Sequence, residues 1–342
     1  MQIGLDPEQR ALGKASGALA ADLASGWDRG RGPSDVASAA PSDADWARIV
    51  EAGWPALRLR EENGGLGAAA VDVAVLVEQL GRHSVAAPVI GTLVAAEQLQ
   101  ALGAPAETLE AIAAGELRVA PLLDAGLLGF APSAEGALAW DSAGATLAYA
   151  PDGSAHALGE PLPTADVTRS VRRPGARVTD RDTALRPPAG DDRDRLHAFV
   201  LTLLVADLLG TMSAALDAAV EHATTRTQFG RPIGSFQAVQ QIAAEDLVSV
   251  EATRSALYFS AWAVDALPPA EALRAARTAK AFASRSGVAV CQDAVQLFGG
   301  IGMTWESPAH VWLRRAQTDR TSFGDEHAHQ AVLADLDLAP GA

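Results

Sequence analysis

The residues best suited to chemistry stand in one short segment, Arg226-Thr-Gln-Phe-Gly-Arg-Pro-Ile-Gly-Ser-Phe-Gln237. The guanidinium of Arg226 offers a rigid fork of donors that matches the geometry of a phosphate. Gln228 adds an amide and Phe229 adds a flat apolar face, while the glycine and proline that follow end a helix and turn the chain. The alternative role for Arg226 is a surface salt bridge at a helix end. The combination favours contact with a phosphate-containing ligand.

A second segment, Gln296-Leu-Phe-Gly-Gly-Ile-Gly-Met-Thr-Trp-Glu-Ser-Pro308, contains adjacent glycines at Gly299 and Gly300. Glycines let a backbone approach a ligand closely because they lack a Cβ atom. They also end helices, and the two roles are compatible. We therefore take Gln296, Gly299 and Gly300 as candidate ligand contacts.

Histidines and acids near the end of the chain do not have the spacing of a metal site. His327 and His329 would lie about 200° apart on a helix, so they do not easily share an ion. With His310 upstream, they are expected on a solvated helix face, and we assign no metal ligand. Asp325 and Glu326 suit the first turn of a helix, where the dipole favours acids. The sequence contains no phosphate loop, nucleophile elbow or dinucleotide fingerprint.

The composition is that of an acidic globular protein. Its 342 residues include 27 Lys and Arg against 42 Asp and Glu, a formal net charge of −15. This balance argues against a broad surface for nucleic acid or for an anionic membrane, and it is compatible with a local basic pocket for phosphates. The single cysteine, Cys291, excludes an intrachain disulfide and suits the reducing cytoplasm, where we expect the protein.

The elements that position these segments are mostly helical. Caps and 3.6-residue periodicity predict helices from Pro7 to about Gly26, from about Ser42, and over 71–82 and 88–102, with a turn-rich stretch over 30–41. Short apolar runs between turn residues predict a small β-domain, followed by a connector from Ser170 to Asp194. Long amphipathic segments predict a helical bundle, at about 195–224, 235–264, 269–298, 308–318 and 325–337. The proposed domains are 1–116, 117–185 and 186–342.

One predicted helix is apolar enough to raise the question of a membrane span. The stretch from Ala198 to Leu216 is interrupted by Asp207, and Asp217 and Glu221 follow on the same helical run. Charges at such positions indicate the central helix of a bundle rather than a membrane span. We therefore expect no membrane association.

The segments at 226–240 and 296–308 resemble the two signatures of the acyl-CoA dehydrogenase C-terminal bundle. Segments 279–284, 62–67 and 78–82 fit the same family. The resemblance implies a mainly α fold with an N-terminal helical domain, a reduced central β-domain and a C-terminal four-helix bundle. It also implies FAD. In the family, residues at the positions of Arg226, Gln228 and Phe229 contact the pyrophosphate and ADP portion of a neighbouring subunit's FAD, and the stretch from Gln296 serves the same FAD.

The resemblance fails where the family performs its proton chemistry. The family oxidises an acyl-CoA thioester with a Glu that removes the α-proton while the β-hydride passes to the flavin. One family position for that Glu falls on Phe323, and a Thr that contacts FAD falls on Asp325. The other position falls near Val200, where His197 is the only titratable neighbour. We therefore assign no catalytic residue.

A third difference lies in the middle of the chain. The family's β-domain carries a Thr-Glu-Pro-Gly-Ala-Gly-Ser type of strand and loop that cradles the flavin ring, and nothing similar stands between Leu117 and Asp182. The chain thus keeps the parts that reach a neighbour's FAD and lacks those that hold its own flavin ring. It resembles the shorter, non-catalytic subunits of the α2β2 acyl-CoA dehydrogenases that actinobacteria use on CoA thioesters of steroid side chains and ring fragments.

Three hypotheses remain open. In the first, the chain is a subunit of an FAD-dependent acyl-CoA dehydrogenase of lipid metabolism. It is active only as a heterotetramer with a larger catalytic subunit that takes the acyl-CoA substrate, and an electron-transfer flavoprotein is a candidate acceptor. In the second, the chain is self-sufficient and Glu326 or Asp325 is a relocated base. In the third, it is a non-enzymatic acyl-CoA-binding scaffold.

Overall fold

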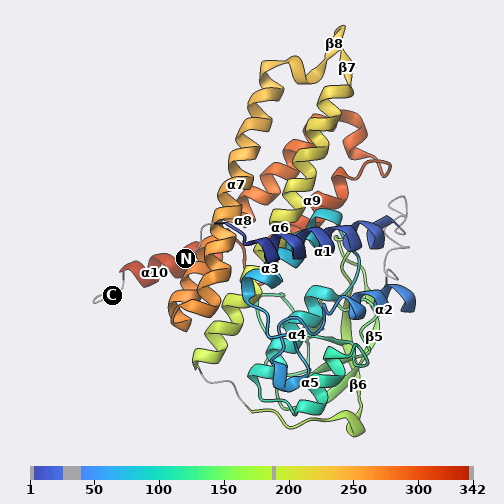
Figure 1. Cartoon of the computed structure of the whole chain (residues 1–342), viewed down its shortest axis with the longest axis vertical. Helices are drawn as coiled ribbons and strands as arrows, with labels where there is room; N and C mark the ends of the chain where they lie inside the picture. Colours follow the sequence, from blue (N-terminus) through green and yellow to red (C-terminus); the bar gives the residue numbers. More distant parts are fainter. Residues whose placement is uncertain (1–3, 26–39, 187–189, 339–342) are drawn as a thin grey trace.

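The computed structural model describes residues 4–25, 40–186 and 190–338 of the chain. Three parts follow one another, as predicted: N-terminal helices, a central β-sheet and a C-terminal group of long helices (Figure 1). The predicted turn-rich stretch over 30–41 lies almost wholly outside the described residues. We retain 1–116, 117–185 and 186–342 as proposed domain limits.

Capping hydrogen bonds determine where two helices of the N-terminal part begin. The Asp6 carboxylate accepts a bond from the Gln9 backbone N–H at 2.8 Å, and Ser42 Oγ accepts one from the Asp45 N–H at 3.1 Å. Both caps are of the predicted type. The elements of this part are α1 (Pro7–Ser25), α2 (Asp43–Glu51), the 3₁₀ turn η2 (Glu61–Asn63), α3 (Ala70–His83), α4 (Val89–Ala101) and the unpredicted α5 (Ala106–Ala113).

A six-stranded sheet forms the central part of the described chain. Its strands, in the order β1-β4-β5-β6-β3-β2, pair antiparallel except for β1 and β4, which run parallel. The predicted connector from Ser170 is wrong in part, because β6 lies within it and pairs along β5. The strands are β1 (Val119–Ala120), β2 (Leu122–Leu123), β3 (Leu138–Ala139), β4 (Leu147–Tyr149), β5 (Ala155–Leu162) and β6 (Val171–Arg177), followed by the 3₁₀ turn η3 (Thr179–Arg181).

The C-terminal part is built around one apolar helix, α6. This helix contacts α3, α7, α8 and α9, and 94% of its most apolar window is buried, so it is a core helix as predicted. The predicted bundle helices match the observed ones to within a few residues. The elements are α6 (Gly190–Thr225), η4 (Ile233–Ser235), α7 (Gln237–Ala266), α8 (Pro269–Phe298), η5 (Gly299–Met303), α9 (Ala309–Thr321) and α10 (Glu326–Leu338).

Two glycines bring the N-terminal part against the bundle. A Cβ atom on Gly210 of α6 would lie 1.9 Å from the carbonyl oxygen of Glu78, and one on Gly81 of α3 would lie 2.2 Å from the carbonyl oxygen of Asp207. Both distances are far shorter than a van der Waals contact, so α3 and α6 cross backbone against backbone only because neither residue has a side chain.

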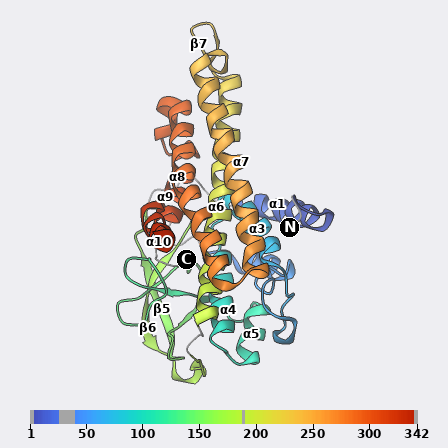
Figure 2. The ribbon, with the colours of Figure 1, turned by 90° about the vertical axis from the view of Figure 1, so that its left-hand side faces the viewer.

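The bundle extends beyond the rest of the molecule at one end. Helices α6, α7 and α8 run past the sheet and the N-terminal helices, and the short strands β7 (Thr227–Gln228) and β8 (Arg231–Pro232) lie at their far tip (Figures 1 and 2). The first sequence motif therefore occupies a projecting end of the structure, away from the sheet.

Candidate functional site

The first motif forms a tight β-hairpin after α6. Gln228 of β7 pairs with Arg231 of β8, and the two turn residues, Phe229 and Gly230, have φ values of +53° and +75°. Two positive φ angles in succession are those of a type I′ turn, which suits two-residue hairpins. The Ile233 backbone N–H donates to the Arg226 carbonyl at 2.8 Å and ties the hairpin to the end of α6. The sequence predicted the turn but not the strand pairing.

The side chains of this hairpin face solvent. Arg226 and Gln228 are exposed, and Phe229 is 92% exposed. No carboxylate of the described residues lies within ion-pair distance of Arg226, so the structure offers no support for the salt-bridge alternative. An exposed cation, amide and aromatic ring on a fixed turn are suited to bind a phosphate and to cover a flat part of another molecule.

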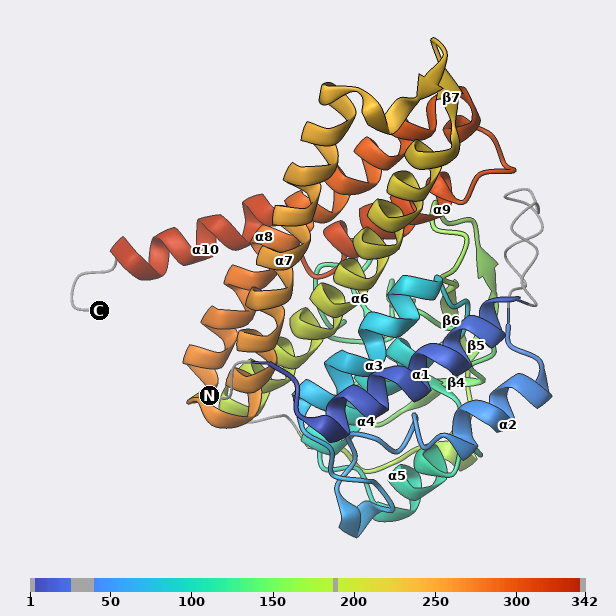
Figure 3. The same ribbon diagram turned by 45° about the horizontal axis from the view of Figure 1, so that its top comes forward.

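The second motif lies at the same end of the bundle as the first (Figure 3). The Phe298 ring at the end of α8 stacks on His222 of α6, with centroids 4.7 Å apart. Gln296 is exposed, and Gly299 ends α8 with φ +66°. No atom lies within 4 Å of a Cβ built on Gly299 or on Gly300. The backbone at both glycines is therefore uncovered, and their contact with a ligand stays a prediction.

Of the two positions expected to hold the family's base, one is Phe323 and the other lies near Val200, three residues after His197. Phe323 and His197 have centroids 6.3 Å apart, and Phe130 contacts them at 5.3 and 5.8 Å respectively. We call these three residues the ring cluster. Phe323 is 6% exposed, and Val200 is fully buried one turn along α6 from His197. Burial, followed by the charge of Arg277, lowers the pKa of His197 and keeps it neutral at pH 7. The ring cluster contains no carboxylate.

Backbone contacts fix Phe323 in this place. Its N–H donates to the Leu127 carbonyl at 2.7 Å, and both residues have φ +57°, a region that bulky residues rarely adopt. The fully buried Lys280 donates from Nζ to the carbonyls of Arg320 and Gly324, at 2.9 and 2.7 Å. Burial lowers the pKa of Lys280 to about 7. The loop that carries Phe323 is thus held from the sheet and from α8 together.

The two acids proposed as a relocated base are engaged elsewhere. The Asp325 carboxylate accepts bonds from the backbone N–H groups of His327 and Ala328, at 3.1 and 3.0 Å, and caps α10. Its bond from Ala328 is the main reason that its pKa is lowered. Glu326 accepts two bonds from Arg320, at 2.8 and 2.5 Å, which lower its pKa. A lowered pKa makes each carboxylate a weaker base.

The prediction of a solvated face for the histidines is wrong for His329. His327 is exposed, but His329 is 2% exposed and its Nδ1 lies 3.3 Å from an Arg277 nitrogen. Burial, Lys280 and Arg277 together lower the pKa of His329 to about 4, so it docks α10 as a neutral ring. Among the described residues, no group of three metal-ligating side chains lies close enough together to hold an ion.

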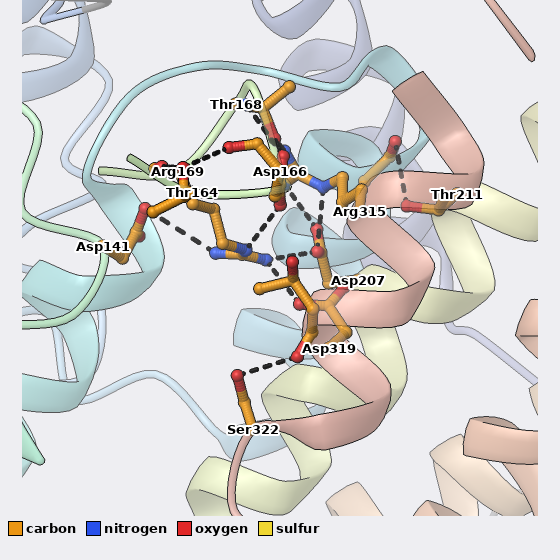
Figure 4. Close-up of polar contacts among 12 residues, drawn as sticks. Asp141, Thr164, Asp166, Thr168, Arg169, Asp207, Thr211, Arg315, Asp319 and Ser322 are labelled. Atoms are coloured by element: carbon orange, nitrogen blue, oxygen red, sulfur yellow. Dashed lines mark hydrogen bonds and ion pairs between the residues drawn. The ribbon is translucent and has the colours of Figure 1, made fainter. Parts of the chain in front are cut away.

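A buried group of charges, which sequence reasoning missed, joins the three parts of the chain (Figure 4). We call it the ionic cluster. None of its members is more than 5% exposed. They come from the loops around the sheet, from α6 and from α9, and they are Asp141, Asp166, Arg169, Asp207, Arg315 and Asp319. Asp207, which interrupts the apolar run of α6, was the one sequence signal for this cluster.

Arg315 and Arg169 share Asp207 at the centre of the cluster. Arg315 donates two bonds to the Asp207 carboxylate, at 2.9 and 2.7 Å. Arg169 donates to Asp207 and, at 2.9 Å, to Asp319. Its guanidinium also lies 4.9 Å from the ring centroid of Trp140. A buried guanidinium needs such a set of acceptors, because the cost of removing it from water is large.

The acids of the cluster differ in protonation. Burial raises the pKa of Asp207, but the charges of Arg315 and Arg169 outweigh this effect and hold it below the usual range. Burial raises the pKa of Asp319 well above the usual range despite Arg169, and the charge of Asp207 adds to the effect. The pKa values of these two carboxyls are therefore shifted in opposite directions, as expected when two buried acids share the same arginines.

Two family profiles match the chain: the acyl-CoA dehydrogenase N-terminal domain over residues 18–116 and the C-terminal domain over residues 202–335. The acyl-CoA dehydrogenase IpdE2 of Mycolicibacterium smegmatis is 34% identical over 82% of this chain and 83% of its own length. The chain belongs to the acyl-CoA dehydrogenase family. IpdE2 of Mycobacterium tuberculosis is 32% identical over 83% of this chain and 85% of its own length.

Solved acyl-CoA dehydrogenases share the fold. A chain of the steroid acyl-CoA dehydrogenase Tcur3481–Tcur3483 superposes with a TM-score of 0.78 at 25% identity, covering 96% of this chain and 97% of that one. A chain of the ChsE4–ChsE5 complex from Mycobacterium tuberculosis gives 0.78 at 22% identity, with both chains fully covered. Butyryl-CoA dehydrogenase from Megasphaera elsdenii gives 0.76 at 18% identity, covering 99% of this chain and 100% of that one.

Proposed function

We propose that this chain is the non-catalytic subunit of a heteromeric, FAD-dependent acyl-CoA dehydrogenase that oxidises the α,β bond of an acyl-CoA thioester. The ring cluster is the observation that supports this most strongly. Both positions for the family's base hold side chains without a carboxylate, and Phe323 cannot accept a proton. A larger partner subunit then supplies the base and the site for the flavin ring. The names of two solved relatives, a steroid acyl-CoA dehydrogenase and a ChsE4–ChsE5 complex, fit a steroid-type heteromer.

The part of this chain in such an enzyme is to bind the outer half of the partner's FAD. The FAD supplies the acceptor for the substrate hydride. Arg226 pairs with the pyrophosphate, Gln228 donates its amide to the same region, and Phe229 covers the ADP portion. Gln296 and the open backbone at Gly299 and Gly300 approach that portion from the end of α8. The six residues belong to the hairpin after α6 and to the junction of α8 with η5, and these segments lie at the projecting end of the bundle, where a second subunit can reach them.

The net charge and the burial of α6 support a proposal for where the enzyme is located. With a net charge of −15 and an apolar helix α6 that is buried in the core, we place the enzyme in the cytoplasm, bound to neither nucleic acid nor membrane. The proposed substrate is a CoA thioester with a bulky, steroid-derived acyl group, and the proposed electron acceptor is an electron-transfer flavoprotein. No contact in the structure favours a relocated base at Asp325 or Glu326, because both carboxylates are already engaged.

The test is the cofactor content of a heteromer. Co-expression with a longer family member from the same source should give a yellow complex. We expect Arg226→Ala to weaken FAD retention by roughly tenfold or more, since a hydrogen bond to a charged group contributes about 1.5–3 kcal/mol. Arg60→Ala, an exposed arginine of the N-terminal part, is the matched control and should retain FAD. Wild-type retention by the Arg226→Ala complex would overturn the proposal.

A further inference from the structure

The ionic cluster lies at the junction where the resemblance to the family places a flavin ring. In the family, the ring sits between the β-domain cradle and the elements that carry the base. Here Arg169 comes from the loop between β5 and β6. Asp207 lies on α6, seven residues or about two turns after Val200, and Asp319 lies on α9, four residues or about one turn before Phe323. The cluster therefore joins the same three elements that would surround the ring.

Buried side chains in mutual contact occupy this junction. The Trp140 ring is fully buried, and the guanidinium of Arg169 lies over it. On the neighbouring side, the ring cluster and the bond from the Phe323 N–H to the Leu127 carbonyl close the gap between sheet and bundle. The cavities beside Arg58 and Tyr258 are lined by side chains outside the ionic cluster. A flavin would have to displace paired, buried guanidiniums.

The cluster also connects the parts that a cofactor would connect. Arg315 of α9 donates to the Val85 carbonyl after α3 at 3.2 Å and to Thr168 Oγ1 of the sheet at 2.7 Å, besides its bonds to α6. The Asp141 carboxylate accepts a bond from the Gly91 N–H of α4 at 2.7 Å. Each part of the chain thus bonds to the cluster directly.

We infer that the ionic cluster takes the place of the flavin ring in this chain, so that the chain binds no FAD of its own and folds without a cofactor. The inference rests on the proposed function for the location of the ring in the family. It goes further by naming the side chains that fill the site and by assigning them the cofactor's structural role.

Thermal unfolding of the purified full chain, with and without FAD, tests the absence of an internal site. A site with a Kd of about 1 µM would raise Tm by about 4 °C at roughly 100 µM FAD. We expect a shift below about 1 °C, and no flavin absorbance after dialysis. The titration is repeated with Arg226→Ala. A rise in Tm that disappears in this variant reports the hairpin and agrees with the inference, whereas a rise that persists in it overturns the inference.

Substitutions in the cluster test the structural role. Arg169→Leu leaves Asp207 and Asp319 with less compensation, and we expect Tm to fall by about 5 °C. Arg177→Leu is the matched control, because Arg177 makes exposed bonds to Asp182 on the same sheet and its loss should shift Tm by less than about 2 °C. Equal effects of the two changes would overturn the inference.

Asp319→Asn is a test in which the substituted protein is expected to remain folded. The Asn side chain keeps an oxygen that can accept from Arg169, as Asp319 does at 2.9 Å, and it removes one of the acids that share the two arginines, so Tm should stay within about 2 °C of the wild type. Asp207→Asn, which removes the acceptor of both arginines, should destabilise as strongly as Arg169→Leu. The reverse order would overturn the inference. None of these outcomes depends on the heteromer, whose FAD content tests the proposed function separately.

Discussion

The resemblance to the family predicts that Phe323 occupies the position of a proton-accepting Glu, and the side chain has effects beyond the absence of a carboxylate. Its ring packs on Phe130 from the sheet, and its N–H bonds to the Leu127 carbonyl in the same loop. An ionised Glu in this buried position would be costly without a charged partner. Phe323 thus makes an apolar contact between sheet and bundle, which is consistent with the proposal that a partner performs the chemistry.

The engaged state of Asp325 and Glu326 leads to a prediction for the assembled enzyme. Glu326→Gln and Asp325→Asn should each leave turnover of the heteromer within about twofold of the wild type, because neither carboxylate acts as a base. Arg226→Ala, assayed in parallel without added FAD, is the positive control for a change that matters. A loss of about 100-fold in either acid variant, with FAD content and Tm unchanged, would instead support the relocated base.

At the scale of elements, the helices were predictable and the sheet was less so. Caps such as Ser42 and the long amphipathic periods are local signals, and the observed helices start and end within a few residues of the expected positions. Strand β6 was missed because its sequence, Val171-Arg-Arg-Pro-Gly-Ala-Arg177, lacks the alternation of a half-buried strand; six of its seven residues are exposed or partly exposed. Pairing with β5, a non-local contact, makes it a strand.

The docking of α10 depends on a neutral His329, which gives a prediction with a definite sign. Its pKa is about 4 in the fold against about 6.5 when unfolded. Between these values the unfolded chain binds a proton that the folded chain does not, so the unfolding free energy falls as the pH drops from 6.5 to 4. The loss at pH 5 is about 2 kcal/mol.

His329→Gln should remove this loss of unfolding free energy at low pH. We would measure the unfolding free energy of both proteins in urea at pH 7 and at pH 5. The value for the wild type minus that for the variant should be about 2 kcal/mol lower at pH 5 than at pH 7. Asp319 and Asp246, whose raised pKa values act in the opposite direction, are present in both proteins and cancel. His327→Gln, at the exposed neighbouring histidine, is the control. Parallel pH profiles for all three proteins would contradict the prediction.

At the scale of the whole molecule, the ionic cluster shows what a single sequence cannot reveal. Its members extend from Asp141 to Asp319, and no spacing rule connects them. The motifs at Arg226 and Gln296 were accessible because each is a continuous segment. The cluster depends on how the three parts of the chain are placed, and that placement depends on α6, which contacts the N-terminal part and the other bundle helices.

The crossing of α3 and α6 should therefore be the most sensitive point of the assembly. A methyl group on Gly210 would meet backbone atoms, the Glu78 carbonyl oxygen at 1.9 Å and the Arg82 nitrogen at 2.5 Å, so the two helices must move apart. We expect Gly210→Ala to lower the unfolding free energy by about 3 kcal/mol. Gly287→Ala is the matched control in α8, because its methyl group would meet only the Leu208 side chain, at 2.9 Å.

Both substitutions gain about 1 kcal/mol of helix propensity, so that term cancels in the comparison. Leu208 can change rotamer to make space, whereas the backbone of α3 cannot move without separating the N-terminal part from α6 and pulling Val85 away from Arg315. Urea unfolding of the three proteins gives the two free-energy differences. If Gly210→Ala proves no more destabilising than Gly287→Ala, the crossing does not set the placement of the parts, and the ionic cluster must do so alone.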